Sequence, residues 1–309
     1  MAGGSKNGPP TPVLVGVTAS GKTDLLMRLR ERHDFQVISA DSRQVYRGMD
    51  IGTAKPSAGE MEHLPHHMVD IVDPDSDFSA GDFARRAEQL MAVMLGEGSI
   101  PVVCGGTALY IMALTGALDP MPGRCPGVRE GLGTLEAENP GFMMALLRMA
   151  DPASADSIGE RDARRQVRAL ELLFLAGEPA STLRRGGDPA VRKLYSITGI
   201  EVPDGELRMR IFERTSRMIR NGLVDEVRGL LEKGYGRESA LGRTIGYREV
   251  LDYLDGDIEG LDRLIRAIET STWHLVRRQR NMFRRIPGIT WISGENAVEA
   301  ESLLFRKGG

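Results

Sequence analysis

The sequence predicts an α/β protein built on a doubly wound parallel sheet. An apolar run at residues 13–15 leads into a glycine-rich loop at 16–23, and a helix-permissive stretch at 24–32 follows it. Short apolar runs then alternate with helical patterns, as is typical of parallel sheets covered by helices on both faces. With 41% hydrophobic and 27% charged residues, the composition is that of a globular protein. No apolar run approaches the roughly 18 residues that a membrane span needs.

The glycine-rich loop reads GVTASGKT and fits the pattern G-x-x-x-x-G-K-[ST] at every fixed position. Between a buried strand and a helix N-terminus, such a loop curls its backbone N–H groups around phosphate oxygens. The lysine adds a positive charge, and the hydroxyl of Thr23 is suited to ligate Mg²⁺ held by those phosphates. The fold is therefore expected to be P-loop NTPase-like. The residues expected to bind a di- or triphosphate are Gly16, Thr18, Ala19, Ser20, Gly21, Lys22 and Thr23.

Further elements follow in order along the chain. Up to residue 110 we expect strands at 36–40, 67–72 and 101–104, and a helix at 81–96 capped by Ser79. The breaker-rich segment 119–126 interrupts this alternation. After it we expect helices at 128–138, 141–150 and 161–176, a strand at 194–200, helices at 205–222, 223–233 and 261–285, and a last strand at 289–292.

This order predicts a core that is discontinuous in sequence. Residues 1–12 would form a flexible tail, and residues 13–121 and 191–309 the α/β core. Residues 122–190 would form an all-helical insertion. Cys104 and Cys125 offer no disulfide framework, and the N-terminus does not resemble a secretory signal, so we expect a cytoplasmic protein. Core packing is the expected role of Cys104, and a monomer is the default state.

Two residues at strand ends are candidates for chemistry. Asp41 follows the predicted strand at 36–40, and Thr107 follows the one at 101–104. Ligands of open α/β sheets bind at the carboxyl ends of the strands. There, a carboxylate could hold Mg²⁺ through water or accept a proton from a nucleophile, and a hydroxyl could contact a phosphate.

Arginines form three stripes at helical spacing, although the net charge of −3 does not by itself indicate a nucleic-acid binder. Like charges on one helix face repel each other unless an anion lies nearby, so three stripes beside a phosphate loop suggest a long polyanion. The stripes are Arg161, Arg164, Arg165 and Arg168; Arg210, Arg214 and Arg217; and Arg277, Arg280 and Arg284, with Arg278 and Arg285 beside the last.

With these residues in view, the sequence resembles the tRNA dimethylallyltransferase (tRNA isopentenyltransferase) family over roughly residues 13–291. The most specific block is residues 41–56, DSRQVYRGMDIGTAKP. Supporting blocks are 65–71 (PHHMVDI), 78–83 (FSAGDF), 105–110 (GGTALY), 243–248 (RTIGYR) and 277–279 (RRQ).

The resemblance implies transfer of a dimethylallyl group from dimethylallyl diphosphate to N6 of the adenosine 3′ to the anticodon of tRNA (position 37). It implies that the phosphate loop and Mg²⁺ hold the diphosphate, that Asp41 is the general base, and that Thr107 and Arg210 steady the departing diphosphate. The tRNA contacts that it implies are Asp41, Ser42, Arg43, Gln44, Arg164, Arg165, Gln166, Arg168, Arg243, Gly246, Tyr247, Arg248, Arg277, Arg278, Gln279, Arg280 and Arg284.

Some positions depart from the family pattern. Val17 stands where the family usually has proline, and Asn281 and Met282 stand where it tends to a threonine–tryptophan pair. The block 164–168 has its glutamine and arginine shuffled. These departures bear on the RNA contacts more than on the phosphate loop.

Two other functions fit part of the sequence. A P-loop kinase of a nucleoside or small metabolite would share the first 110 residues' architecture, with Asp41 as base for a hydroxyl. It would not need three arginine stripes. A nucleotide switch or RNA-binding protein without chemistry is a further alternative, but no N-K-x-D base-reading motif occurs in the chain.

Overall fold

The computed structural model describes residues 9–119, 121–183, 187–294 and 296–305. The chain divides into two compact units, Met1–Thr115 with Ala190–Gly309, and Gly116–Pro189. Within the described residues, no helix is both long enough and apolar enough to cross a membrane.

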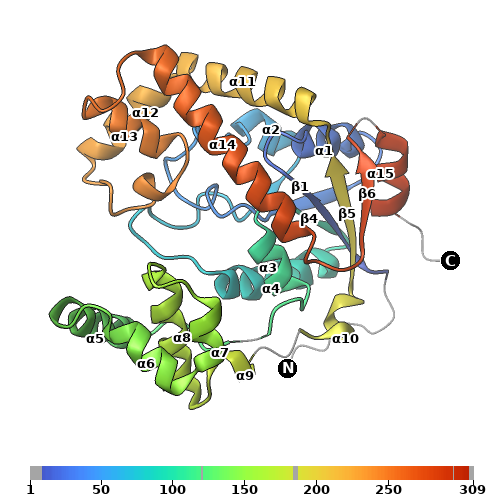
Figure 1. Ribbon diagram of the computed structural model, residues 1–309. Helices are drawn as coiled ribbons and strands as arrows, with labels where there is room; N and C mark the ends of the chain where they lie inside the picture. Colours follow the sequence, from blue (N-terminus) through green and yellow to red (C-terminus); the bar gives the residue numbers. More distant parts are fainter. Residues whose placement is uncertain (1–8, 120, 184–186, 295, 306–309) are drawn as a thin grey trace. The chain divides into compact units, whose positions relative to one another are not determined.

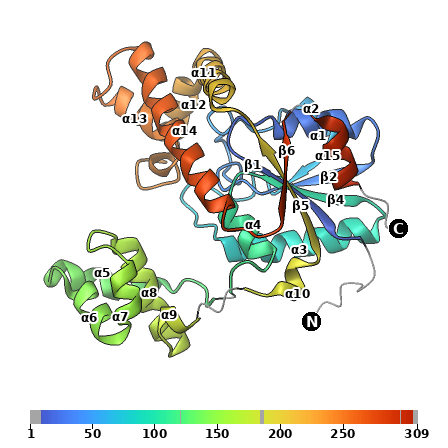
Figure 2. The same cartoon turned by 45° about the vertical axis from the view of Figure 1, so that its right-hand side comes forward.

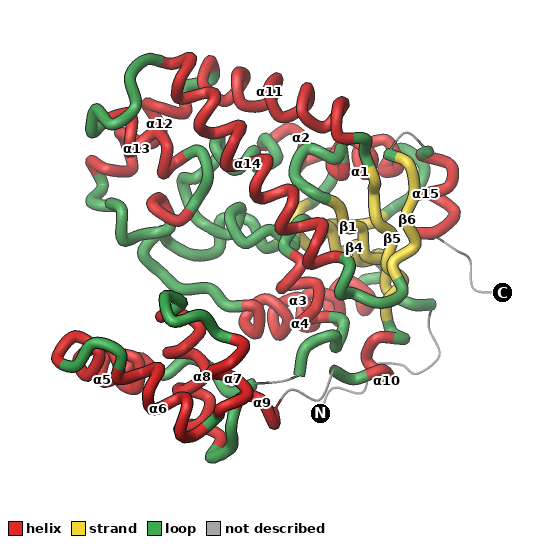
Figure 3. Tube along the Cα trace, in the orientation of Figure 1, coloured by secondary structure: helices red, strands yellow, loops and turns green. Residues whose placement is uncertain are grey.

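The first unit contains one six-stranded sheet in the order β3-β2-β4-β1-β5-β6, and all of its strands are parallel (Figures 1 and 3). The predicted fold class, a P-loop NTPase-like doubly wound parallel sheet, is confirmed. The strands are β1 (Thr11–Gly16), β2 (Phe35–Ser39), β3 (His66–His67), β4 (Ile100–Gly105), β5 (Tyr195–Glu201) and β6 (Ile289–Ser293).

Helices cover both faces of this sheet. Helices α1 and α15 lie on one face and α3 and α4 on the other (Figure 2). The helices of this unit are α1 (Lys22–Arg30), α2 (Ala58–His63), α3 (Ala80–Gly96), α4 (Ala108–Leu114), α10 (Pro189–Arg192, whose first residue belongs to the second unit), α11 (Asp204–Arg220), α12 (Leu223–Glu232), α13 (Tyr247–Leu254), α14 (Leu261–Phe283) and α15 (Ala297–Leu304), with a 3₁₀ turn at Leu241–Arg243.

Local sequence explains the start of α3. The Ser79 hydroxyl accepts the Asp82 N–H at 3.1 Å, and the Asp82 carboxylate accepts the Ser79 N–H at 3.0 Å. This reciprocal capping box satisfies backbone donors that a helix N-terminus leaves free. The predicted cap at Ser79 is therefore confirmed.

The predicted strand at 67–72 is wrong for most of its length. Only His66–His67 pairs with β2, and a single isolated bridge joins Val72 to Tyr46. The backbone at Met68 and Asp70 has positive φ values of 67° and 54°. These left-handed residues interrupt the extended conformation, so the segment does not continue β3. Its later N–H groups, at residues 70–72, donate instead to carbonyls of residues 44 and 45.

Two charged side chains, of which Lys55 is buried and Glu226 partly exposed, hold the 41–56 block against the rest of its unit. The Lys55 side chain is 4% exposed, and its Nζ donates to the Tyr46 carbonyl at 2.5 Å and contacts the carboxylates of Asp50 and Asp70. The Glu226 carboxylate accepts the backbone N–H of residues 50 (3.1 Å), 51 (2.8 Å) and 52 (3.4 Å). These contacts hold the irregular segment 41–56 in one conformation.

The second unit is all-helical and has its own apolar core. Glu171 lies at its centre with a side chain that is 0% exposed. The Glu171 carboxylate accepts hydrogen bonds from Arg129 (2.7 and 2.8 Å), Arg168 (2.6 Å) and the Cys125 N–H (2.8 Å). The helices are α5 (Pro126–Glu138), α6 (Phe142–Ala150), α7 (Pro152–Ser157), α8 (Ala163–Ala176) and α9 (Ala180–Leu183).

Two elements, β1 and α8, begin at residues other than those expected from the sequence. Strand β1 begins at Thr11, so the last two residues of the expected tail 1–12 belong to the sheet, while residues 1–8 lie outside the described part. Helix α8 begins at Ala163, because the Asp162 carboxylate caps it by accepting the Arg165 N–H at 3.1 Å. Arg161 therefore precedes this helix and does not belong to its arginine stripe.

We predict that the Glu171 cluster makes stability depend on pH. Burial by itself raises the pKa of Glu171, but the hydrogen bonds from Arg129, Cys125 and Arg168 lower it to about 2. A carboxylate whose pKa falls on folding stabilises the protein above its unfolded pKa, near 4.5, and this stability is lost as pH falls from there toward 2. The loss should reach about 3 kcal/mol.

Hydrogen exchange of the α8 amides in the whole protein, measured between pH 3 and 6, tests this expectation. Glu171→Gln should already be destabilised at pH 6 and should show a weaker pH dependence below pH 5. An equal pH dependence in both proteins would contradict it. Glu138→Gln, at an exposed position of α5, is the control and should behave like the wild type.

We also predict that Glu226→Gln destabilises the first unit by about 1–3 kcal/mol, because an amide cannot accept all the N–H groups that the carboxylate accepts. Urea unfolding measures the change. Glu213→Gln, at an exposed position of α11, is the matched control and should stay within about 0.5 kcal/mol of the wild type. A Glu226→Gln protein as stable as this control would show that the hydrogen bonds from Glu226 to residues 50–52 do not contribute to stability.

Candidate active site

The phosphate loop lies between β1 and α1 at the carboxyl end of the sheet. Ser20 is buried, and Gly21 has φ 84°, a left-handed conformation that glycine adopts without strain. Lys22 Nζ donates to the carbonyls of Gly16 and Val17, each at 2.9 Å, and contacts Ser20 Oγ at 3.4 Å. The lysine is thus folded onto its own loop, and its ammonium group has only uncharged acceptors there.

Burial lowers the pKa of Lys22, and the nearby guanidinium of Arg214 lowers it further, against opposing effects of Cys104 and Asp41. A buried cation with a lowered pKa gains most when an anion binds beside it. Cys104 is buried at the end of β4, and burial raises its pKa to about 11. This cysteine therefore remains a thiol that packs in the core, as expected.

Asp41 follows β2 at the same edge of the sheet. Its Oδ1 accepts the Arg43 N–H at 2.8 Å, which fixes the carboxylate in a local turn. The carboxylate is near enough to raise the pKa values of Lys22, Arg43 and Arg214, although burial, the largest effect, lowers all three overall. Among the described residues, no second hydrogen bond reaches the Asp41 carboxylate, so one oxygen remains available to a ligand.

Thr107 lies directly beside Asp41's loop. Its Oγ1 accepts the Ser42 N–H at 2.9 Å and lies 3.3 Å from Ser42 Oγ, while its own N–H donates to the Ala40 carbonyl at 3.1 Å. These contacts join the carboxyl ends of β2 and β4. The sequence prediction that Asp41 and Thr107 share an edge of the sheet is confirmed by this geometry.

Arginines of α11 approach the same place. The Arg210 guanidinium lies against the phosphate loop, since its Nη1 is 3.1 Å from where a Cβ on Gly21 would stand. Arg210 also pairs with Glu206 one turn earlier. Arg214, four residues further along, donates to the Thr53 carbonyl at 3.3 Å and is close to Asp41. Arg214 is therefore a candidate site residue as well, although of the arginines on α11 the family resemblance implies a role only for Arg210.

Two further residues of the 41–56 block, Arg43 and Gln44, are also expected to contact tRNA. Gln44 accepts from Ser39 Oγ at 2.9 Å and donates to the Ala54 carbonyl at 3.1 Å, so its side chain is used within the protein. Burial lowers the pKa of Arg43, which lies near Tyr46 and Tyr110. Gln44 therefore shapes the loop, and Arg43 adds a further partly buried cation.

Several residues expected to contact tRNA have structural partners. Tyr247 is fully buried and donates to Glu226 at 2.5 Å, and burial followed by the Glu226 charge raises its pKa. Gly246 is buried, and its N–H donates to Glu249 at 2.7 Å. Gln166, in the helical unit, is 2% exposed and donates to the carbonyls of residues 159 and 160. The direct RNA contacts of Tyr247 and Gln166 stay predictions, but in this structure burial withdraws both side chains from the surface.

Apart from Arg43, the arginines expected to contact tRNA fall into three groups. Arg168 binds Glu171, Arg280 pairs with Asp204 at 2.5 Å, and Arg248 pairs with the buried Glu249. Weaker or surface contacts are made by Arg165 with Asp162 (3.2 Å) and by Arg243 with Asp77 (4.0 Å). The third group is exposed and makes no ion pair with the described residues: Arg164, Arg277, Arg278 and Arg284.

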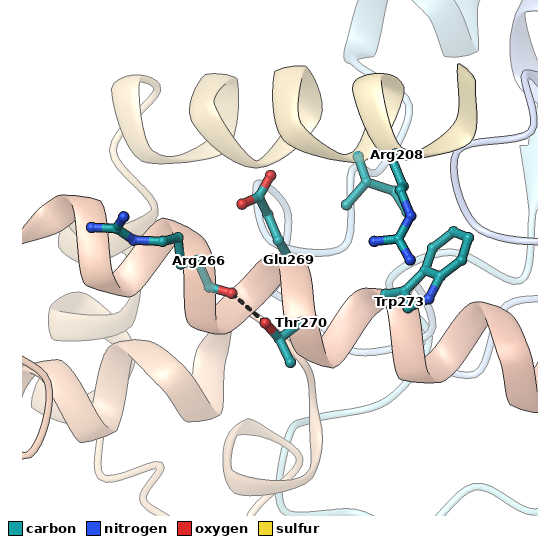
Figure 4. A pocket seen from close by; sticks show the side chains of 6 residues that line it. Arg208, Arg266, Glu269, Thr270 and Trp273 are labelled. Atoms are coloured by element: carbon teal, nitrogen blue, oxygen red, sulfur yellow. Dashed lines mark hydrogen bonds between the residues drawn. The ribbon is translucent and has the colours of Figure 1, made fainter. Parts of the chain in front are cut away.

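A separate hollow of about 340 Å³ lies between α11 and α14 (Figure 4). The Arg208 guanidinium stacks over the Trp273 ring with its carbon 3.8 Å from the centroid. Glu269 and Arg266 face the same hollow, and burial raises the pKa of Glu269. Its lining includes no residue of the phosphate loop, so it is distinct from the phosphate cradle.

The chain is similar in sequence to known families of prenyl-group transferases. A family model described as IPP transferase matches residues 44–286, and one described as Isopentenyl transferase matches residues 11–73. A protein of Geobacter sulfurreducens named tRNA dimethylallyltransferase is 39% identical over 98% of this chain and 99% of its own length. One of Pelobacter propionicus named tRNA dimethylallyltransferase 1 is 40% identical over 92% and 94%.

Solved structures agree with these relatives. The tRNA isopentenylpyrophosphate transferase of Bacillus halodurans superposes with a TM-score of 0.68 at 32% identity, over 96% of this chain and 95% of that one. A eukaryotic dimethylallyltransferase acting on tRNA shares the fold with a TM-score of 0.77 at 23% identity, over 96% and 76%. The comparisons favour this family over the kinase reading. The chain belongs to the tRNA dimethylallyltransferase (IPP transferase) family.

Proposed function

We propose that this protein transfers the dimethylallyl group of dimethylallyl diphosphate to N6 of adenosine 37 in tRNA and releases diphosphate. The observation that supports this proposal most directly is that the phosphate loop, Asp41, Thr107 and Arg210 lie together at one edge of the sheet. In the reaction, the allylic carbon–oxygen bond breaks and a bond from N6 to that carbon forms. The proton lost from N6 goes to a base.

The phosphate loop and its neighbouring cations would bind the diphosphate. Its backbone amides and Lys22 would face the phosphates, and Arg210 lies against the same loop beside Gly21. An allylic carbon ionises readily once its leaving group is stabilised, so electrostatic help to the diphosphate supplies most of the catalysis. Thr107 would add a hydroxyl beside the leaving group.

The residues also fit Mg²⁺. Thr23, at the start of α1, is exposed, and hydroxyl and phosphate oxygens are the hard ligands that this ion prefers. Bound to the diphosphate, Mg²⁺ would supply neutralisation of leaving-group charge. Asp41 would act on the other substrate by accepting a hydrogen bond and then the proton from N6 of an adenine that has left its stack.

Exposed arginines would hold the RNA outside this edge. Arg277, Arg278 and Arg284 of the first unit and Arg164 of the helical unit are suited to phosphate contacts. The helical insertion, at 122–190 by sequence, would act as a clamp on the anticodon stem-loop. We further propose that the enzyme acts as a monomer in the cytoplasm.

We predict that Asp41→Asn abolishes most of the transfer. Purified protein is mixed with Mg²⁺, labelled dimethylallyl diphosphate and unmodified tRNA, and label on RNA is counted. Loss of a general base should slow transfer by about 10²–10⁴-fold. Asp257→Asn, an exposed residue outside the site, should retain wild-type activity. Phosphate transfer to a small acceptor without labelled RNA would instead support the kinase alternative.

We predict that Arg284→Ala weakens binding to an anticodon stem-loop and makes its salt dependence less steep by about one in the log–log slope. Filter binding between 50 and 200 mM salt measures the slope. Arg228→Ala removes an exposed arginine that pairs with Asp225 at 2.9 Å and should leave the slope unchanged. Equal slopes for the Arg284→Ala protein and the wild type would exclude Arg284 from the RNA interface.

A further inference from the structure

The side chain of Gln279 reaches from α14 to the phosphate loop. Its Oε1 accepts the Thr18 N–H at 2.9 Å, and its Nε2 donates to the Gly106 carbonyl at 2.8 Å. One carboxamide therefore joins the loop after β1 to the segment after β4. These partners lie 261 and 173 residues away in the sequence.

The space around this carboxamide is closely fitted. A Cβ added at Gly106 would stand 2.6 Å from Gln279 Nε2 and 3.3 Å from the Gly16 carbonyl oxygen. Only a residue without a side chain leaves room for the bridge. Since Oε1 faces a donor and Nε2 faces an acceptor, the two hydrogen bonds also determine which way the amide points.

The flanking residues of α14 have different tasks. Arg278 is exposed, while Arg280 donates to the Val202 carbonyl at 3.2 Å and pairs with Asp204. Gln279, expected from the family resemblance to contact tRNA, has both ends of its carboxamide occupied by protein backbone. A side chain used in this way is withdrawn from RNA and acts on the phosphate loop.

We propose that Gln279 is a positioning residue that holds the phosphate loop in the shape that binds diphosphate. This assignment rests on the proposed function, because it concerns the grip on the diphosphate of the same reaction. Thr18 is the third residue of the loop, and the amides of residues 19–23 follow it in the sequence. Fixing the Thr18 N–H against the end of β4 pre-organises those amides before the anion arrives.

The consequence is a specific loss when the bridge is removed. Methionine has nearly the length of glutamine and makes neither hydrogen bond, so Gln279→Met frees the loop while filling the space. We expect inorganic diphosphate to bind about tenfold more weakly, the effect of about one neutral hydrogen bond. Binding of the anticodon stem-loop should change by less than about twofold.

The test measures both ligands on the whole protein. Calorimetry gives the affinity for inorganic diphosphate with Mg²⁺, and filter binding gives that for the stem-loop. Gly106→Ala is a second route to the same state, because its methyl group displaces the carboxamide while leaving Gln279 in place. His274→Gln, an exposed position on α14, is the control, and thermal unfolding checks that each variant folds.

The outcomes separate this inference from the proposed function. Weaker diphosphate binding in both variants, with a higher KM for dimethylallyl diphosphate and an unchanged KM for tRNA, supports the positioning role. Unchanged diphosphate binding with weaker RNA binding overturns it and makes Gln279 an RNA contact. If the wild type binds neither ligand, the proposed function fails, and the role of Gln279 fails with it.

Discussion

The candidate site depends on how closely β2 and β4 approach at their carboxyl ends. The Ala40 N–H donates to the Cys104 carbonyl at 2.7 Å, and a Cβ on Gly105 would stand 2.1 Å from the Ala40 carbonyl oxygen. No side chain could occupy that position. Because the two backbones touch here, Asp41 and Thr107 are held beside the phosphate loop of the neighbouring strand β1.

Several cations lie at this edge of the sheet, and burial destabilises their charged forms. Burial lowers the pKa values of Lys22, Arg43 and Arg214, and Asp41 is the carboxylate that offsets part of the effect for all three. A diphosphate entering such a site would be attracted by positive groups that water does not screen well. The same arrangement that costs folding free energy thus favours anion binding, a common feature of functional sites.

The irregular 41–56 block keeps its shape through one charged side chain of its own, Lys55, and one from α12, Glu226. Lys55 gathers one carbonyl and two carboxylates, and Glu226 gathers three successive amides of the block. Such segments lack the repeating hydrogen bonds of helices and strands, so charged side chains satisfy part of their backbone. Asp41 stands at the start of a rigid segment for this reason.

The sequence by itself determined the parallel α/β fold, the phosphate loop, the family and the position of Asp41 at a strand end. These features are local, because a glycine pattern, a short apolar run or a capping residue acts through its immediate neighbours. The prediction of a strand at 67–72 is wrong because the backbone of Met68 and Asp70 is left-handed. Hydropathy contains no information about that conformation.

Only the tertiary structure decided which polar residues are free to act. Arginine spacing on α14 cannot reveal that Arg280 pairs with Asp204 of another helix, or that Gln279 bonds to backbone 261 residues away. Burial of Tyr247 likewise follows from the packing of α12 and α13 around the 41–56 block. Partners brought together by folding decide whether a charged or amide side chain binds RNA or supports the site, and sequence spacing carries no record of them.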